Sequence, residues 1–325
     1  MESTIAKFTV IVTDDRHAGE YSFEREQLAR AGAELLVRNC QTPEEVIAEC
    51  QDADGLLVNL APITRDVVQA LPKCRIISRY GVGYDNVDVP ACTERGILFT
   101  YVPDFCAEDV SDHALALLLS CVRRTARRDA QVRAGLWNIG RAEKLYRMQG
   151  KTFVFLGFGQ IAKALRRKLS GFGFSRFLAY DHKDAETLAA FGVTKVSWEE
   201  ALAEADYLSV HIPLRPENIN LLNADAFSLM KPTAILINTA RGPIIDEGAL
   251  ATALQSGALA YAGIDVYAKE PIEPMNPLLS VENCVLTDHT GWYTEESFVE
   301  LKTKAAHNIA EFLLGNPPPY PVNKI

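Results

Sequence analysis

The sequence predicts an α/β protein made of two doubly wound domains, each a parallel sheet with helices on both faces. Strand-like and helix-like segments alternate along nearly the whole chain, which is typical of this architecture. The strand-like segments, such as "KFTVIVTD" (7–14), are short apolar runs that suit a sheet covered on both sides. The length of 325 residues fits two domains, each with its own core.

The first series of elements predicts a small unit of four or five strands, followed by a long helix. The expected strands lie at 7–14, 34–38, 55–59 and 75–81, with helices near 20–31, 43–50 and 64–70 between them. A helix is expected over 107–135, because apolar residues recur there at every third and fourth position.

The second series predicts a larger sheet. Its expected strands, with helices between them, lie at 152–157, 176–181, 194–197, 207–211, 235–239, 262–267 and 284–289. A final helix near 295–314 ends at Gly315, and the proline-rich "NPPPYP" follows.

Composition and charge exclude several classes of function. The net charge of −9, without a lysine-rich run, argues against a nucleic-acid partner. No apolar stretch approaches the ~18 residues of a membrane span, so neither a membrane partner nor a targeting segment is expected. The seven cysteines form no C-x-x-C pair and favour a reducing cytoplasm. The histidines have no metal-ligand spacing, so no metal is expected.

A glycine-rich turn opens the second series. Gly157, Gly159 and Ala162 form G-x-G-x-x-A where an apolar strand turns into a helix, which is the Rossmann fingerprint for a dinucleotide pyrophosphate. Asp181 ends the next strand, where its carboxylate would accept hydrogen bonds from the adenosine ribose hydroxyls and repel a 2′-phosphate. This pattern favours NAD over NADP, although the adjacent His182 and Lys183 could accommodate a phosphate.

Further motifs occur in a fixed order along the chain. They are "RYGVGYDNVD" (79–88), "GFGQIA" (157–162), "VHIPL" (210–214), "INTARGPIIDEGAL" (237–250), "GIDVYAKEP" (263–271) and "TDHTGW" (287–292). Together they resemble the D-isomer-specific 2-hydroxyacid dehydrogenases, in particular the branch that holds phosphoglycerate dehydrogenase-like enzymes and the C-terminal binding protein corepressors. The resemblance implies two Rossmann-like domains with a cleft between them. The expected substrate domain is 1–101 plus 294–325, and the expected NAD-binding domain is 102–293.

Arg241 lies at the carboxyl end of an apolar strand, which is an unusual place for a permanent charge. Ligands of open α/β sheets bind beyond these strand ends, and a guanidinium suits the neighbouring carboxylate and carbonyl of a 2-oxo acid. The resemblance gives Arg241 the role of the family's catalytic arginine. The alternative is a surface ion pair.

His289 matches the family's proton donor. A ketone reduced by hydride becomes an alkoxide that needs a proton, and histidine is suited to supply it near neutral pH. Glu270 matches the glutamate that would orient the imidazole and favour its charged form. Asp288 replaces the family's usual proline, and its carboxylate could alter the neighbouring histidine or turn away from it.

The resemblance also supplies further site residues. Asp265 matches a residue that contacts the nicotinamide carboxamide. The other expected cofactor contacts are Gln160, Ile161, His211, Pro213, Thr239 and Ala240. A possible anion-binding nest for the substrate carboxylate comprises Tyr80, Gly81, Val82 and Gly83. Arg79 matches a phosphate-binding position of phosphoglycerate-type enzymes, or it pairs with a surface acid.

These observations predict an NAD-dependent oxidoreductase that interconverts a 2-oxo acid and an (R)-2-hydroxy acid. Two alternatives stay open: a dimeric NAD-binding interaction protein of the corepressor type, and a short phosphoglycerate dehydrogenase. The second is weakened because the sequence ends soon after "NPPPYP", before the regulatory domain of many such enzymes. By resemblance we expect a homodimer with residues 107–150 at its interface.

Overall fold

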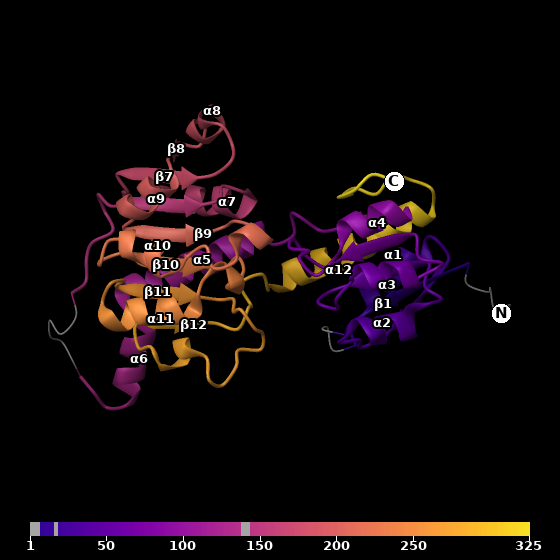
Figure 1. The fold of residues 1–325 in the computed structure, drawn as a ribbon, viewed down its shortest axis with the longest axis horizontal. Coiled ribbons are helices and arrows are strands. Elements are labelled where there is room, and N and C mark those ends of the chain that lie inside the picture. The colour runs from indigo at the N-terminus through magenta and orange to yellow at the C-terminus, as the bar shows by residue number, and fades with distance from the viewer. Residues whose placement is uncertain (1–6, 16–18, 138–143) are drawn as a thin grey trace. The chain divides into compact units, whose positions relative to one another are not determined.

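The computed structural model of the chain describes residues 7–15, 19–137 and 144–325 (Figure 1). The chain divides into two compact units. Unit 1 comprises Met1–Phe105 with Thr294–Ile325, and unit 2 comprises Cys106–Tyr293. No helix in the described ranges is long and apolar enough to cross a membrane.

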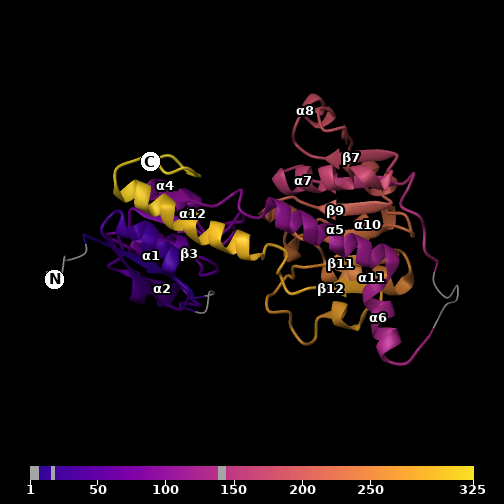
Figure 2. The same cartoon turned by 180° about the vertical axis from the view of Figure 1, so that it is seen from behind.

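Unit 1 is a five-stranded parallel sheet with the strand order β2-β1-β3-β4-β5. Two helices pack together on one face and three cover the other (Figures 1 and 2). The strands are β1 (Phe8–Val12), β2 (Ala33–Val37), β3 (Gly55–Val58), β4 (Ile76–Arg79) and β5 (Leu98–Thr100). The paired helices are α1 (Ser22–Ala29) and α12 (Glu295–Leu313), and the opposite three are α2 (Pro43–Cys50), α3 (Arg65–Ala70) and α4 (Val89–Arg95).

Helix α4 and strand β5 are not among the elements that periodicity predicted for unit 1. Helix α4 begins at an ordinary signal, since Asp88 accepts a hydrogen bond from the backbone of Ala91 and Pro90 lies in the first turn. Three other helices of unit 1 also begin at side-chain N-caps. These are α2 at Thr42, α3 at Thr64 and α12 at Thr294.

Unit 2 is a seven-stranded parallel sheet with the order β12-β11-β10-β9-β6-β7-β8. Its strands are β6 (Thr152–Leu156), β7 (Arg176–Tyr180), β8 (Thr194–Lys195), β9 (Tyr207–Val210), β10 (Ile235–Asn238), β11 (Tyr261–Ile264) and β12 (Cys284–Leu286). The strand order reverses between β6 and β9. In doubly wound sheets such a reversal opens a crevice for dinucleotides at the carboxyl ends of the strands.

Helices cover both faces of this sheet and enclose two apolar cores. One core lies under α5 (Ala107–Arg123) and α7 (Gln160–Lys168). The other lies under α9 (Trp198–Glu204), α10 (Ala224–Leu229) and α11 (Glu247–Ser256). Figure 2 shows α5 and α7 in front of the strands, and Figure 1 shows α10 and α11 in front. The short α8 (Ala185–Ala189) packs beside β8.

The single helix expected over 107–135 is wrong, because the segment forms two helices. Arg124 adopts the left-handed region with φ of 57° between α5 and α6 (Thr125–Arg133). Its guanidinium lies 3.9 Å from the centre of the Tyr261 ring and donates to the carbonyl of Cys121. Helix α5 buries an apolar face, whereas α6 buries no residue, so the chain turns where core contacts end.

Candidate functional site

The parallel strands of unit 2 bring most of the expected site residues to one edge of the sheet. Each of these residues follows the carboxyl end of a strand, and parallel strands share that edge. They are Gly157 after β6, Asp181 after β7, His211 after β9, Thr239, Ala240 and Arg241 after β10, Asp265 after β11, and His289 after β12. Arg79 to Gly83 belong to unit 1 and follow β4.

The glycine-rich turn has the geometry that a pyrophosphate needs. Gly157 has φ of +85°, and a Cβ there would lie 2.8 Å from the carbonyl oxygen of His211, so only glycine fits. A Cβ on Gly159 would meet no atom within 4 Å, which leaves open space beside the first turn of α7. No side chain caps that turn, so the backbone N–H groups of Gln160 and Ile161 remain for a ligand.

Asp181 is fixed by contacts with the same turn. Its carboxylate accepts hydrogen bonds from the backbone N–H groups of Phe158 (2.6 Å) and Lys183 (2.8 Å). Burial raises the pKa of Asp181, but these two bonds and the charges of Lys183 and His182 together outweigh it, and the pKa falls below its usual value. The exposed His182 and the Lys183 ammonium approach the carboxylate at 3.5 and 3.4 Å. The carboxylate therefore stays charged and couples the glycine-rich turn to β7.

The segments after β9 and β10 lie on one side of the place where the strand order reverses. His211 is neutral, because burial lowers its pKa to about 3, and its Nε2 lies 2.8 Å from the hydroxyl of Ser209. The neighbouring Pro213 is exposed. The hydroxyl of Thr239 is buried and has no hydrogen-bond partner among the residues that the structure describes. An unpaired buried hydroxyl at this edge fits a polar ligand such as a nicotinamide cofactor.

The turn that carries Arg241 is built by its neighbours. Asn238 is fully buried, accepts a hydrogen bond from Ala240 N–H (3.0 Å) and donates one to the carbonyl of Arg241 (3.0 Å). Gly242 lies against the backbone of Tyr267, since a Cβ on this glycine would be 1.8 Å from the tyrosine carbonyl carbon. The asparagine and the glycine of the N-x-x-R-G motif thus set the position of the arginine.

His289 and Glu270 form a close pair. The imidazole Nδ1 lies 2.6 Å from one Glu270 oxygen, and the other oxygen accepts a hydrogen bond from the backbone of Tyr267 (2.9 Å). Burial raises the pKa of Glu270, but the hydrogen bond and charge of His289 outweigh it, and the pKa lies below its usual value. Glu270 is therefore a carboxylate at neutral pH and accepts a hydrogen bond from the imidazole Nδ1–H.

The backbone around His289 is held by Asp265, which is 2% exposed. Its two oxygens accept hydrogen bonds from Thr290 N–H (3.2 Å), Gly291 N–H (3.0 Å) and the Thr287 hydroxyl (2.6 Å). This anchoring accounts for a left-handed φ of 59° at His289, which a side chain other than glycine seldom adopts. Asp265 thus holds the turn that carries His289.

Residues that the sequence did not single out complete this anchor. His113 on α5 places its Nε2 2.9 Å from the Thr287 hydroxyl and 3.2 Å from Asp265. Tyr267 donates from its phenol to the carbonyl of Thr287 (2.7 Å). No sequence signal identifies these partners, because they come together only when α5, β11 and β12 pack. The exposed Asp288 accepts a hydrogen bond from the Thr290 hydroxyl (2.8 Å).

The loop after β4 in unit 1 has a different character. Arg79 is 9% exposed, and its guanidinium donates to the carbonyl of Tyr80. Gly81 has φ of +129°, and a Cβ there would lie 1.9 Å from that guanidinium. Val82 and Gly83 are partly buried. The arginine thus folds over its own loop in this structure, and glycine at position 81 makes room for it.

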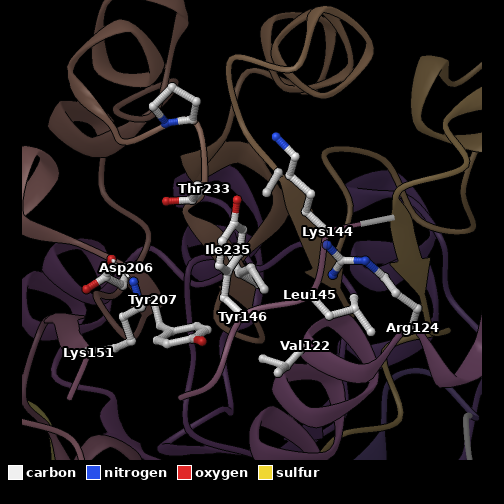
Figure 3. A pocket seen from close by; sticks show the side chains of 12 residues that line it. Val122, Arg124, Lys144, Leu145, Tyr146, Lys151, Asp206, Tyr207, Thr233 and Ile235 are labelled. Atoms are coloured by element: carbon white, nitrogen blue, oxygen red, sulfur yellow. Dashed lines mark ion pairs between the residues drawn. The ribbon is translucent and has the colours of Figure 1, made fainter. Parts of the chain in front are cut away.

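A cavity of about 210 Å³ lies at the opposite edge of the unit 2 sheet, near the amino ends of β9 and β10 (Figure 3). It is lined by cationic and aromatic side chains that include Arg124, Lys144, Tyr146, Lys151 and Tyr207. None of the expected site residues lines it. Across the described ranges, no group of three or more His, Cys, Asp or Glu residues could hold a metal ion.

Comparisons with known proteins agree on one family. Residues 115–291 match the NAD-binding domain of the D-isomer-specific 2-hydroxyacid dehydrogenases. The chain is 39% identical to a glyoxylate reductase of Korarchaeum cryptofilum over 86% of this chain and 85% of that protein. It is 37% identical to a D-3-phosphoglycerate dehydrogenase of Mycobacterium leprae over 91% of this chain and 56% of that protein.

A solved structure agrees as well. The fold is similar to that of a D-lactate dehydrogenase of Aquifex aeolicus in complex with NAD and lactic acid. The TM-score is 0.85 with 26% sequence identity, and the match covers 94% of this chain and 96% of that one.

Proposed function

The chain belongs to the family of D-isomer-specific 2-hydroxyacid dehydrogenases, and we propose that its substrate is a short 2-oxo acid such as glyoxylate or hydroxypyruvate. It is an NAD-dependent enzyme that interconverts a 2-oxo acid and a 2-hydroxy acid. The observation that carries the proposed site is the 2.6 Å pair of His289 and Glu270 at the sheet edge that also bears Arg241 and the glycine-rich turn.

Residues of this edge fit NAD. The turn from Gly157 to Ile161 would hold the pyrophosphate, and Asp181 the ribose hydroxyls. The nicotinamide end would lie against His211, Pro213 and the Thr239–Ala240 backbone, where the buried Thr239 hydroxyl offers a hydrogen bond. We propose that Asp265 acts indirectly, by fixing the turn of His289, since protein donors already bond to both of its oxygens.

The chemistry of reduction divides between the cofactor and two side chains. Bound NADH would supply the hydride to the substrate carbonyl carbon. Arg241 would bind the carboxylate and polarise the adjacent carbonyl. His289 would give its proton to the oxygen as the oxygen becomes an alkoxide, and would take it back in the oxidative direction. Glu270 would orient the imidazole in both directions, and its carboxylate would stabilise the imidazolium from which the proton leaves.

The backbone N–H groups of Val82 and Gly83 would bind the substrate carboxylate. Those of Tyr80 and Gly81 donate instead to the carbonyls of Val58 and Arg79. The position of Arg79 favours a small substrate over a phosphorylated one, because its guanidinium already bonds to the carbonyl of Tyr80. We therefore prefer glyoxylate or hydroxypyruvate to phosphohydroxypyruvate.

Steady-state kinetics test this proposal. Loss of NADH absorbance is measured with glyoxylate, hydroxypyruvate, pyruvate and phosphohydroxypyruvate, and the configuration of the glycerate formed from hydroxypyruvate is determined. We expect the highest kcat/KM for the first two acids, and D-glycerate as product. Preference for the phosphorylated acid would instead identify a phosphoglycerate dehydrogenase. NADH binding without turnover of any acid would favour the interaction protein of the corepressor type.

We also propose a homodimer in the cytoplasm. Large apolar side chains are exposed along the end of α6 and the segment after it, with Val132 at 55%, Leu136 at 58% and Trp137 at 76%. Apolar groups gathered in this way are typical of an interface. All seven cysteines are free thiols, which suits a reducing compartment.

A further inference from the structure

Unit 1 contains a buried polar cluster that the proposed chemistry does not use. Lys302 on α12 and Glu24 on α1 both have side chains that are 0% exposed, and the ammonium lies 3.5 Å from one carboxylate oxygen. The phenol of Tyr80, which follows β4, donates a hydrogen bond to the same oxygen at 2.9 Å. Figure 2 shows α1 and α12 side by side on one face of this unit.

A contribution to the stability of the fold is a weak explanation for this buried polar cluster. A buried ion pair gains little over an apolar pair of the same volume, because both charges lose their hydration. The Lys302 ammonium lies over the rings of Tyr21 (4.5 Å) and Phe298 (4.8 Å), and it has no hydrogen-bond partner in the described ranges. Burial raises the pKa of Glu24 and lowers that of Lys302, each against the attraction of the other.

Tyr80 connects the cluster to the loop after β4, because its phenol bonds to Glu24 and its backbone belongs to the loop. Tyr80 is 2% exposed, and the contact of its phenol with Glu24 fixes one end of the residue. Its backbone N–H donates to the carbonyl of Val58 at 2.8 Å, and its own carbonyl accepts from Arg79. The next residue, Gly81, donates to the Arg79 carbonyl at 3.0 Å. These contacts fix the direction in which the backbone continues from Tyr80 to Gly81.

We propose that Glu24 and Lys302 are positioning residues for the substrate, which act through Tyr80 on the backbone N–H groups of Val82 and Gly83. This inference rests on the proposed role of that loop in binding the substrate carboxylate. The charge of Lys302 opposes the effect of burial and favours the ionised form of Glu24, whose carboxylate holds the phenol more strongly than a neutral acceptor would. The helix α12, from the end of the chain, thereby contributes to substrate affinity without touching the substrate.

The test separates the hydrogen bond of Tyr80 from the packing of its ring. Tyr80→Phe removes only the hydroxyl. We expect the KM for the 2-oxo acid, and the dissociation constant of oxalate as an inert probe on the NADH complex, to rise roughly tenfold, as for loss of a charged hydrogen bond. The kcat should stay within about twofold, because the proton donor and Arg241 are unchanged.

Glu24→Leu with Lys302→Met replaces the ion pair by apolar groups and should give the same rise. Adding Tyr80→Phe to this pair should raise KM no further, since the three residues act as one chain. Tyr21→Phe is the matched control, because it removes a phenol that bonds to Asp15 (2.7 Å) and keeps the ring under the Lys302 ammonium. We expect this variant to match the parent.

Unchanged KM and oxalate affinity in Tyr80→Phe would overturn the inference, as would a fall in kcat alone or an equal rise in Tyr21→Phe. Additive effects of Tyr80→Phe and the apolar pair would overturn it too. If the parent turns over a 2-oxo acid, each of these results leaves the proposed function standing. A parent that neither turns over any 2-oxo acid nor binds oxalate would overturn the proposed function and the inference together.

Discussion

The side chain and the backbone of His289 are held by separate sets of contacts. Glu270 bonds to the ring, while Asp265 bonds to the N–H groups that follow it in the chain. The first contact affects the charge of the imidazole, and the second affects where the imidazole lies. Variants of the two acids should therefore differ in their effects, with pH dependence altered only through Glu270.

We expect Glu270→Gln to move the fall in the rate of reduction to lower pH. Reduction needs the protonated imidazole, so its rate holds at acid pH and falls as pH rises. The pKa of Glu270 lies below its usual value, so its carboxylate is charged over the whole pH range in which the rate falls, where its charge opposes loss of the imidazole proton. Glutamine keeps the shape and removes the charge. The measurement is kcat/KM for reduction across pH.

The same series needs two reference variants. His289→Ala should lose on the order of 10²–10⁴ in kcat, the usual contribution of a positioned acid or base. Asp288→Asn should leave the profile in place, because Asp288 bonds to the Thr290 hydroxyl. A profile that moves with Asp288→Asn and not with Glu270→Gln would show that Asp288 tunes the donor.

Asp181 should set the choice of cofactor. We expect kcat/KM to favour NADH over NADPH by at least tenfold, about 1.4 kcal/mol, and Asp181→Ala to narrow this ratio. The alanine variant should also bind NADH more weakly, since the carboxylate holds the Phe158 N–H of the glycine-rich turn. Asp184→Asn is the control, because it removes a nearby charge but keeps an N-cap residue on α8. Equal use of both cofactors by the parent would show that His182 and Lys183 dominate.

At the scale of elements, turns are shaped by how closely neighbouring segments approach. Gly242 lies against the backbone of Tyr267, whereas Gly159 faces open space. Both glycines lie in conspicuous sequence motifs, and the sequence alone gives no reason to assign them different roles. The structure separates them, because one glycine serves the packing of the protein and the other leaves room for a ligand.

We expect Gly242→Ala to destabilise the protein by several kcal/mol and to remove activity, because the added Cβ would overlap a carbonyl carbon. Gly159→Ala should keep the melting temperature of the apo protein and lose affinity for NADH. Thermal unfolding and NADH titration distinguish the two. Gly171→Ala, whose Cβ also meets no atom within 4 Å, should be neutral in both measurements. Normal NADH affinity in Gly159→Ala would contradict the assigned pyrophosphate site.

At the scale of the whole molecule, the exposed apolar residues around Trp137 predict a dimer in solution. We expect sedimentation to give twice the chain mass of 35.9 kDa at micromolar concentration. Leu136→Glu with Trp137→Glu should give monomers, because charges would be buried in the interface. Leu229→Glu on α10, which alters another exposed leucine (46%), should leave the dimer intact. A monomeric parent protein would refute the proposal.

Much of the fold could be read from local sequence. The alternation of apolar strands and amphipathic helices predicted the α/β class, and the fold comparisons confirm it. The family, its NAD dependence and the type of reaction are also confirmed. Periodicity failed over 107–135, because a break at Arg124 needs only one residue in a left-handed conformation. Helical spacing on either side of such a residue gives no warning of it.

The sequence by itself determined which residue types stand at the carboxyl ends of the strands, because strand ends and motifs depend on residues close together in the chain. Only the tertiary structure decided where their hydrogen bonds go. Asp265 and Arg79 bond within the protein, and His113 joins the turn of His289. Lys302 meets Glu24 because α12 packs beside α1. Such contacts join segments far apart in sequence, and burial forces polar groups there to find partners that no local pattern specifies.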